Sequence, residues 1–225
     1  MAQDKTRSNT ALLERESPVA VQDKKGYLIV KRIMDILCSL AALVVLGPVI
    51  LLIALLIFID DPHGSPFFCQ TRVGKDGKEF KFWKLRSMVC NAEELLADLQ
   101  DQNEMDGPAF KIENDPRITR IGHFIRKCSI DELPQFWNVL KGDMSLVGPR
   151  PPIPKEVEEY TPYQMQRLSV KPGLTCIWQV QPRRNDLSFD EWVELDLEYI
   201  RNRSIFMDLK LMFQTLRAVF GGEGR

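Results

Sequence analysis

The sequence predicts a mixed α/β fold, mostly helical, in which a membrane-inserted helix precedes a small α/β domain. Three observations predict it: a long run without charged residues, two short aromatic-rich segments separated by a turn sequence, and several later segments with apolar residues at helical spacing. We therefore expect a polar extension over residues 1–26, a membrane helix over residues 27–61 and a single domain over residues 62–225.

The composition restricts the class of protein. The chain has 225 residues, enough for one compact domain beside a membrane element, and its formal net charge is -1. Lysine and arginine are spread along the chain, so no bulk binding of nucleic acid is expected. The two histidines lie far apart, which argues against a histidine-based triad or metal site. The five cysteines are odd in number and lack C-x-x-C spacing, which indicates reduced thiols; they are Cys38, Cys69, Cys90, Cys128 and Cys176.

The stretch from Ile36 to Ile59 contains no charged residue. It is long enough for a transmembrane helix, which needs about 20 apolar residues. Positive charges precede it and negative charges follow it, so the positive-inside rule places its N-terminal flank in the cytoplasm. A cleaved signal peptide fits poorly, because the run is too long and starts too late. The flanking charges are Lys24, Lys25, Lys31 and Arg32 before the run, and Asp60 and Asp61 after it.

Gly47 and Pro48 fall near the middle of this run and leave two topologies open. Proline removes a backbone donor and clashes with the preceding turn, and glycine weakens the helix further. Either the helix kinks and still crosses the bilayer, as is usual for transmembrane prolines, or it breaks and returns to the same face. Crossing would place everything after Asp60 outside the cytoplasm. Five cysteines without a disulfide pattern favour a return to the same face.

The remaining elements follow from local patterns, in chain order. Strands are predicted at residues 67–74 and 79–86, with a hairpin turn at 75–78 that contains the favoured Asp-Gly step. Helices are predicted at residues 91–103, 119–127, 130–141, 156–170, 190–201 and 208–220, the first with Asn91 as N-cap. Residues 149–154 are expected to be extended, and residues 174–180 to form a short strand. The last helix has a broad apolar face, which suits either the lipid interface or ordinary packing.

Adjacent carboxylates at Asp131 and Glu132 are the main candidates for chemistry. Arg126 lies five residues before Asp131, and a glycine- and proline-rich loop that ends at Arg150 follows the pair. A carboxylate can attack phosphorus, a divalent cation can screen a diphosphate, and arginine can bind phosphate oxygens through two donors. The sequence has no Walker-type phosphate loop. A purely structural alternative is that the two negative charges complement a helix N-terminus.

Eight motifs occur in an order that is specific for one family. They are Lys31-Arg32-Ile33-Met34-Asp35, Thr71-Arg72-Val73-Gly74, Phe82-Trp83-Lys84-Leu85-Arg86-Ser87-Met88, Ser129-Ile130-Asp131-Glu132-Leu133-Pro134-Gln135, Asn138-Val139-Leu140-Lys141-Gly142-Asp143-Met144-Ser145, Gly148-Pro149-Arg150-Pro151, Val170-Lys171-Pro172-Gly173-Leu174-Thr175 and Asp208-Leu209-Lys210. From about Tyr27 to Phe220 the chain therefore resembles the bacterial sugar transferases, which are monotopic polyprenyl-phosphate phosphoglycosyl transferases.

The resemblance implies a protein of the bacterial inner (cytoplasmic) membrane, held by a re-entrant helix, with interfacial amphipathic helices and a catalytic domain that faces the cytoplasm. It implies transfer of a sugar 1-phosphate from a UDP-sugar to undecaprenyl phosphate, with release of UMP, to initiate assembly of an exopolysaccharide, capsule or O-antigen-type glycan. The implied partners are the UDP-sugar, undecaprenyl phosphate and membrane lipid, with a homo-oligomer as a further option and no nucleic acid.

The same resemblance assigns roles to six residues of this chain. Asp131 would be the nucleophile that forms a covalent aspartyl-phosphosugar intermediate, Glu132 its catalytic partner, and Mg2+ would bind at Asp131. Four further residues match substrate-binding positions of the family: Arg126, which would hold phosphate, and Lys84, Arg150 and Asp208.

Two departures from the family pattern concern the helix break and the sugar side of the site. The family often has Ser-Pro at the break, whereas Gly47-Pro48 offers no hydroxyl to the freed backbone groups. Cys176 stands where the family often has glycine after Pro-Gly-x-Thr, and residues 182–186 replace the usual turn. Residues 185–189 resemble members that transfer hexose 1-phosphate, which favours glucose or galactose over N-acetylated sugars.

Two other classes of protein compete with an enzyme. One is a membrane-anchored protein that holds nucleotide or lipid phosphate without turnover, although such a binder would not need the intact pair of Asp131 and Glu132. The other is a bitopic structural protein of an envelope assembly, which would expose the domain after Asp60 outside the cell.

Overall fold

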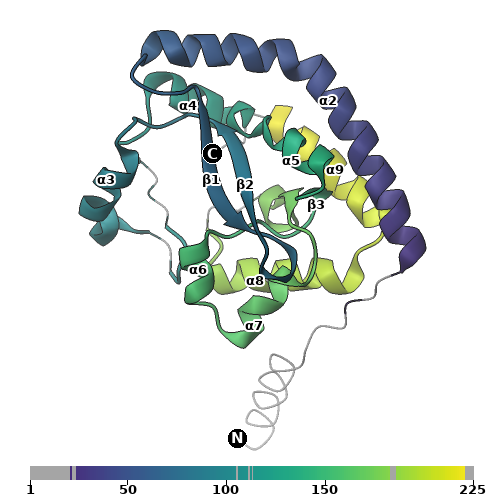
Figure 1. The fold of residues 1–225 in the computed structure, drawn as a ribbon. Coiled ribbons are helices and arrows are strands. Elements are labelled where there is room, and N and C mark those ends of the chain that lie inside the picture. The colour runs from purple at the N-terminus through teal and green to yellow at the C-terminus, as the bar shows by residue number, and fades with distance from the viewer. Residues whose placement is uncertain are drawn as a thin grey trace, which may run out of the picture.

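The computed structural model describes residue 21 and residues 24–104, 106–110, 112, 114–182 and 186–220. Most of the expected polar extension over residues 1–26 lies outside the described residues, and so do residues 183–185 of the sugar-side turn. Within the described residues the fold is mixed α/β and mostly helical, as the sequence predicts. A long helix runs along a domain of shorter helices and two small sheets (Figure 1).

The elements are labelled in chain order, with η for a short 3-10 helix. They are α2 (Lys25–Asp60), β1 (Phe67–Val73), η1 (Lys75–Gly77), β2 (Glu79–Leu85), α3 (Ala92–Leu96), η2 (Ala97–Gln102), α4 (Arg120–Lys127), η3 (Ile130–Glu132), α5 (Gln135–Lys141), β3 (Ser145–Val147), α6 (Pro154–Glu158), α7 (Pro162–Met165), η4 (Gln166–Ser169), β4 (Gly173–Thr175), η5 (Trp178–Val180), α8 (Phe189–Asn202) and α9 (Ile205–Phe220).

Helix α2 continues through Pro48 without interruption. The expected helix–break–helix is therefore a single helix, and Figure 1 shows that its axis bends along its length. A proline inside a helix removes one backbone donor, which is a common cause of such a bend. Among the described residues, α2 is the one helix long and apolar enough to cross a membrane.

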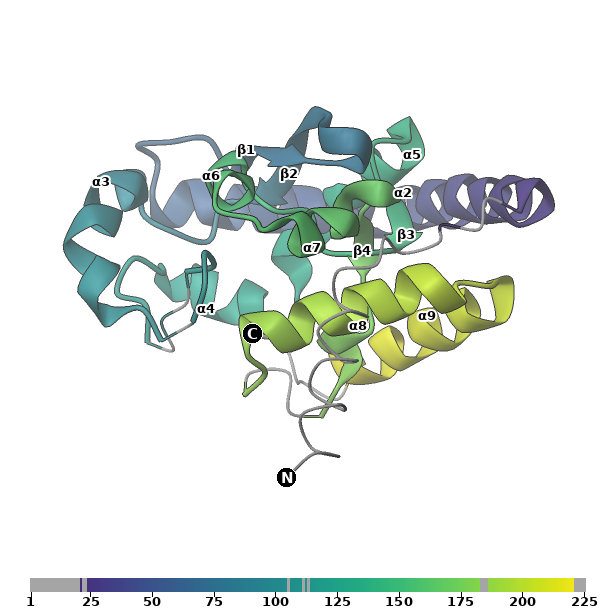
Figure 2. The same ribbon diagram turned by 90° about the horizontal axis from the view of Figure 1, so that it is seen from below.

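Both halves of α2 pack on the same domain, which Figures 1 and 2 show on one side of the helix. The first half contacts α9 and β3 through Lys31 and Asp35. In the second half, Ile53 and Ile57 join a buried apolar cluster that includes Ile125 of α4. The middle of the helix faces outward, since Val44 and Val45 are each 70% exposed. The helix thus touches the domain near both of its ends and leaves its centre uncovered.

Strands β1 and β2 form the predicted antiparallel hairpin, with Phe67 opposite Leu85 and Val73 opposite Glu79. At its turn Asp76 and Gly77 both have positive φ, 57° and 78°. Two-residue hairpin loops favour this conformation because it matches the twist of the strands, and it explains the Asp-Gly step. The prediction of a hairpin at this place is confirmed.

The second sheet forms the centre of the domain. Strands β3 and β4 pair in parallel, with Ser145 opposite Gly173 and Val147 opposite Thr175. A Cβ atom on Gly173 would lie 2.0 Å from the Gly148 nitrogen, so the glycine allows the two backbones to approach closely. Helix α8 covers this sheet in the domain core, where Val147 and Leu197 are fully buried.

Several predicted helices are divided in the structure, and proline explains two of the divisions. The helix expected over 130–141 is wrong: η3 ends at Glu132, and α5 begins after Pro134. The helix over 156–170 is also wrong, because Pro162 opens a new helix, α7, after α6 has ended at Glu158. The helix over 91–103 changes from α to 3-10 geometry at Ala97. The strand expected over 174–180 ends at Thr175 in β4, and Trp178–Val180 form the 3-10 helix η5 instead.

Candidate active site

The two carboxylates lie on η3, a single 3-10 turn between α4 and α5. Ser129 opens this turn with a left-handed backbone, φ 55°, which is strained for a residue other than glycine. Its amide donates to the Arg126 carbonyl at 3.0 Å, which closes the end of α4. Asp131 is buried, with 6% exposure, and Glu132 is half-buried. The turn thus places the pair directly after the last turn of α4.

Lys84 of β2 holds both carboxylates. Its Nζ donates to Glu132 Oε1 at 2.8 Å and lies 3.7 Å from Asp131 Oδ2. The same ammonium lies over the Phe82 ring, 5.6 Å from its centroid. Lys84 is therefore the side chain that links β2 to both carboxylates of the pair. The family resemblance predicted that Lys84 belongs to the same site as the acidic pair, and in the structure the three side chains lie together.

A buried asparagine fixes the strand that carries Lys84. Asn138 of α5 is fully buried; its Oδ1 accepts from the Trp83 amide at 3.1 Å, and its Nδ2 donates to the Lys81 carbonyl at 2.6 Å. These two bonds hold β2 on either side of Phe82, just before Lys84, and join the strand to the helix that follows the acidic pair. Sequence reasoning did not single out Asn138, although a polar residue inside an otherwise apolar helix face was an available signal.

Arg126 lies in the last turn of α4, before the acidic pair. Thr119 caps this helix by accepting from the Gly122 amide at 2.9 Å, as the predicted start at residue 119 requires. The positive charge of Arg126 helps to lower the pKa of the Asp115 carboxyl. Burial alone would raise the pKa of the Asp115 carboxyl, but hydrogen bonds from Arg117 and the charges of Arg117 and Arg126 outweigh it and lower the pKa. The structure thus places Arg126 just before the acidic pair, and its role in holding phosphate stays a prediction.

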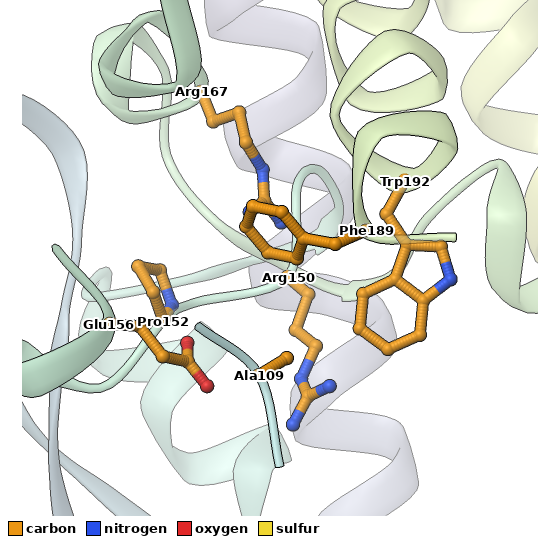
Figure 3. A pocket seen from close by; sticks show the side chains of 7 residues that line it. All are labelled: Ala109, Arg150, Pro152, Glu156, Arg167, Phe189 and Trp192. Atoms are coloured by element: carbon orange, nitrogen blue, oxygen red, sulfur yellow. The ribbon is translucent and has the colours of Figure 1, made fainter. Parts of the chain in front are cut away.

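Arg150 lies in a small cavity beside α8 (Figure 3). Its guanidinium lies over the Trp192 ring, 5.8 Å from the centroid, and Trp192 stacks on Trp178 at 4.3 Å. Arg167, on another wall, is buried against Asp196, with Nη2 2.7 Å from Oδ2. Arg167 thus has its countercharge inside the fold. The lining residues are Ala109, Arg150, Pro152, Glu156, Arg167, Phe189 and Trp192.

Asp208 has a different environment from the acidic pair. It is fully buried at the start of α9, and its Oδ2 accepts from Lys31 Nζ at 2.8 Å and from the Tyr27 hydroxyl at 2.9 Å. Its Oδ1 accepts from the Tyr199 hydroxyl at 2.7 Å. The carboxylate therefore binds α2 to α8 and α9. Its assignment as a substrate contact stays a prediction, and the contacts show a structural role that sequence reasoning missed.

The acidic pair offers a donor set that suits Mg2+. This ion is usually held by one or two carboxylates and completes its shell with waters and substrate phosphates. Asp131 and Glu132 supply the carboxylates on one turn. Among the described residues there is no group of three or more His, Cys, Asp or Glu side chains suited to a metal. The pair fits a cation that binds together with a diphosphate better than one enclosed by protein ligands.

The comparison with known families agrees with this geometry. A family model described as bacterial sugar transferase matches residues 26–222. The chain belongs to this family. The match begins at the start of α2 and includes the hairpin, the acidic pair and α9, so the bacterial sugar transferase unit comprises both α2 and the domain.

Curated relatives of this bacterial sugar transferase are named as transferases of a sugar or of a sugar phosphate. The galactosyl transferase CpsE of Streptococcus agalactiae serotype III is 50% identical over 201 residues, which cover 89% of this chain and 44% of the relative. The undecaprenyl-phosphate galactose phosphotransferase of Salmonella typhimurium is 42% identical over 205 residues, covering 89% of this chain and 42% of the relative. The chain thus spans less than half the length of these two relatives.

A third relative has a length similar to that of this chain. The exopolysaccharide production protein ExoY of Rhizobium meliloti is 37% identical over 224 residues, which cover 96% of this chain and 98% of the relative.

Proposed function

We propose that the protein is a phosphoglycosyl transferase that moves a sugar 1-phosphate from a UDP-sugar to undecaprenyl phosphate and releases UMP. The observation that carries the proposal is the pair of Asp131 and Glu132, held by Lys84, in a chain of the bacterial sugar transferase family. The names of the relatives support the lipid acceptor and the sugar phosphate. A protein that only binds phosphates would not need two charged carboxylates at the site, because they repel an anionic ligand.

In the first step an Asp131 carboxylate oxygen attacks the phosphorus that carries the sugar. A bond forms between this oxygen and phosphorus, and the bond to the bridging oxygen breaks, so that UMP leaves with the electron pair. In the second step a phosphate oxygen of the lipid attacks the same phosphorus, the Asp131 carboxylate is released, and the sugar diphospholipid forms. Lys84 and Arg126 provide positive charge beside the transferred phosphoryl group.

Mg2+ bound at Asp131 would screen the diphosphate and stabilise the charge that develops on the leaving phosphate. Lys84 contacts the same carboxylates and keeps Glu132 in place by a 2.8 Å bond. Lysine cannot replace the cation, because its single charge does not balance two carboxylates and a diphosphate.

The packing of α2 supports a re-entrant topology. A straight helix of 36 residues would be about 54 Å long, more than the hydrocarbon core of about 30 Å requires. Both of its halves contact one domain, and a single domain lies on one side of a bilayer. The outward-facing centre at Val44 and Val45 is the part that would enter the lipid. We propose that the domain faces the cytoplasm at the inner membrane.

Helix α9 would lie at the lipid interface beside α2. Its exposed apolar side chains recur every three or four residues, which places them on one face of the helix. They are Phe206, 79% exposed, Leu209, Phe213 and Leu216. This face supports the interfacial alternative over ordinary packing.

The covalent step gives the decisive experiment. Purified enzyme mixed with a UDP-sugar and Mg2+, without lipid acceptor, should release up to one equivalent of UMP and gain the mass of one sugar phosphate on the peptide that contains Asp131. Asp131→Asn should abolish both signals, because an amide is a poor nucleophile. Glu132→Gln should slow turnover and retain a trace of adduct. An adduct on another residue, or UMP release that requires lipid in a single turnover, would contradict the assignment.

The same assay tests the cation and the sugar. Activity should fall to background after exhaustive chelation and return with added Mg2+, so survival of full activity in excess chelator would exclude a metal requirement. A panel of UDP-sugars should give the fastest UMP release with UDP-glucose or UDP-galactose.

A further inference from the structure

Two charged residues of the membrane helix are buried in the domain. Lys31 and Asp35 lie one helical turn apart on α2 and are 8% and 3% exposed. A helix that serves only to hold a protein on a membrane needs no buried charge, and apolar residues of similar volume often give equal or greater stability. The position of these charges therefore calls for a role other than attachment.

Asp35 fixes strand β3 directly. Its Oδ1 accepts from the Leu146 amide at 2.9 Å and from the Ser145 hydroxyl at 3.0 Å. An amide of a short strand is thus bonded to a helix that is 111 residues away in the sequence. Because β3 has only three residues, these bonds determine where the strand begins.

Lys31 reaches the other end of the same strand through Tyr199. The Lys31 ammonium donates to the Tyr199 hydroxyl at 3.1 Å and to Asp208 Oδ2 at 2.8 Å. The single proton of the Tyr199 hydroxyl is shared between two acceptors, Asp208 Oδ1 at 2.7 Å and the Val147 carbonyl at 3.1 Å. Burial raises the pKa of this hydroxyl well above its usual value, so it keeps its proton. The network ends on Val147, the last residue of β3.

The loop that carries Arg150 begins at that point. Gly148 donates to the Thr175 carbonyl at 2.9 Å, and the Pro149 carbonyl accepts from the Gly173 amide at 2.9 Å. Beyond Arg150, the Pro151 carbonyl accepts from Arg72 Nη1 at 2.9 Å. The loop is therefore held by β4 and β1, and its entry from β3 is held by α2 through the polar network.

We propose that Lys31, Asp35, Tyr199 and Asp208 are positioning residues, through which the membrane helix sets the place of Arg150 and so the affinity for the sugar-nucleotide donor. This inference rests on the proposed function and adds to it that Arg150, which matches a substrate-binding position of the family, contacts the donor phosphates. In this view α2 is part of the scaffold of the donor site as well as the membrane attachment. If the first half of α2 moved away from the domain, β3 and the loop that follows it would lose these bonds.

Tyr199→Phe is the sharpest test, because it removes one hydroxyl and keeps the ring in the core. The donor KM should rise by about tenfold, the scale of one or two lost hydrogen bonds, while kcat changes little. Tyr163→Phe is the matched control, since that hydroxyl is hydrogen-bonded to Glu194 and Arg201 on α8. The control should leave the donor KM unchanged.

A double-mutant cycle shows whether the effect passes through Arg150. If Tyr199 acts by positioning Arg150, then Tyr199→Phe should add little to the loss already caused by Arg150→Ala. If the double variant loses as much donor affinity as the product of the two single losses, the proposal is overturned. An unchanged donor KM in Tyr199→Phe would overturn it as well. If Tyr199→Phe lowers the unfolding temperature markedly, Ser145→Ala replaces it in the same cycle, because it removes one of the two bonds between Asp35 and β3.

Calorimetric binding of the UDP-sugar to each variant separates this inference from the proposed function. Wild-type enzyme that neither binds the donor nor releases UMP would refute the proposed function itself. Wild-type activity combined with multiplicative losses in the cycle would refute only the positioning role.

Discussion

Lys171 carries a positive charge that the surrounding fold does not favour. Its Nζ and Nη2 of Arg32 both reach the space beside Gly142. Arg32 itself is committed to the end of α5, where it donates to the carbonyls of Val139 and Leu140 at 2.7 Å. Burial and the charge of Arg32 lower the pKa of Lys171, and Asp35 and Asp143 offset this only in part.

The lowered pKa predicts how stability depends on pH at this residue. The charged form is disfavoured in the folded state, so its cost is present near neutral pH and is relieved as the pH rises through the folded pKa. Lys171→Met should therefore unfold at a higher temperature than wild type near pH 7, and the difference should shrink toward pH ~10. Lys78→Met, at the exposed hairpin turn, is the control. A lower unfolding temperature for Lys171→Met at neutral pH would show that the lysine is stabilising.

At the scale of elements, the position of α4 depends on a glycine. A Cβ on Gly122 would lie 2.0 Å from the Ser87 carbonyl oxygen, and that carbonyl also accepts from the Thr119 amide at 3.1 Å. Both groups are backbone, so neither can turn away as a flexible side chain would. The glycine therefore sets the distance between α4 and the segment after β2.

Gly122→Ala should move α4 and with it the turn that carries the acidic pair. We expect a loss of roughly 1–3 kcal/mol in the free energy of unfolding from overpacking. Turnover should fall further, by about a hundredfold if the pair shifts by ~1 Å. Gly26→Ala in the first turn of α2, where a Cβ meets no atom within 4 Å, is the matched control and should retain full activity. An unfolding temperature and a turnover equal to wild type would show that α4 tolerates the methyl group.

The elements that local sequence determines were predicted well. The uncharged run and the Asp-Gly hairpin turn are each set by neighbours within a few residues, and the structure confirms the helix and the turn. The divided helices show the limit of periodicity. Apolar spacing continues across Pro134 and Pro162, but proline lacks the donor that a continuous helix needs.

At the scale of the whole molecule, the features that could not be predicted from the sequence are those that depend on contacts between distant segments. The parallel pairing of β3 with β4 and the burial of Asp208 against Lys31 depend on contacts between segments far apart in the sequence. The structure therefore adds to Asp208 a place in a network between three helices, while its contact with substrate stays a prediction. The family resemblance predicted that Lys84 and Asp131 belong to one site. The two residues are 47 positions apart in the sequence, and the hairpin and η3 bring their side chains together.

The placement of the whole protein in the membrane is the remaining question, and native cysteines can report on it. Cys69 and Cys90 are exposed on the domain, and Lys24→Cys adds a site before α2. If α2 returns to the cytoplasmic face, an impermeant thiol reagent should modify none of the three in intact cells and all three after permeabilisation. Val45→Cys, at the outward-facing centre of α2, should resist the reagent in both cases because lipid covers it. Modification of Cys69 in intact cells, with Lys24→Cys protected, would show that the helix spans the bilayer and that both of its ends cannot pack on one domain as they do here.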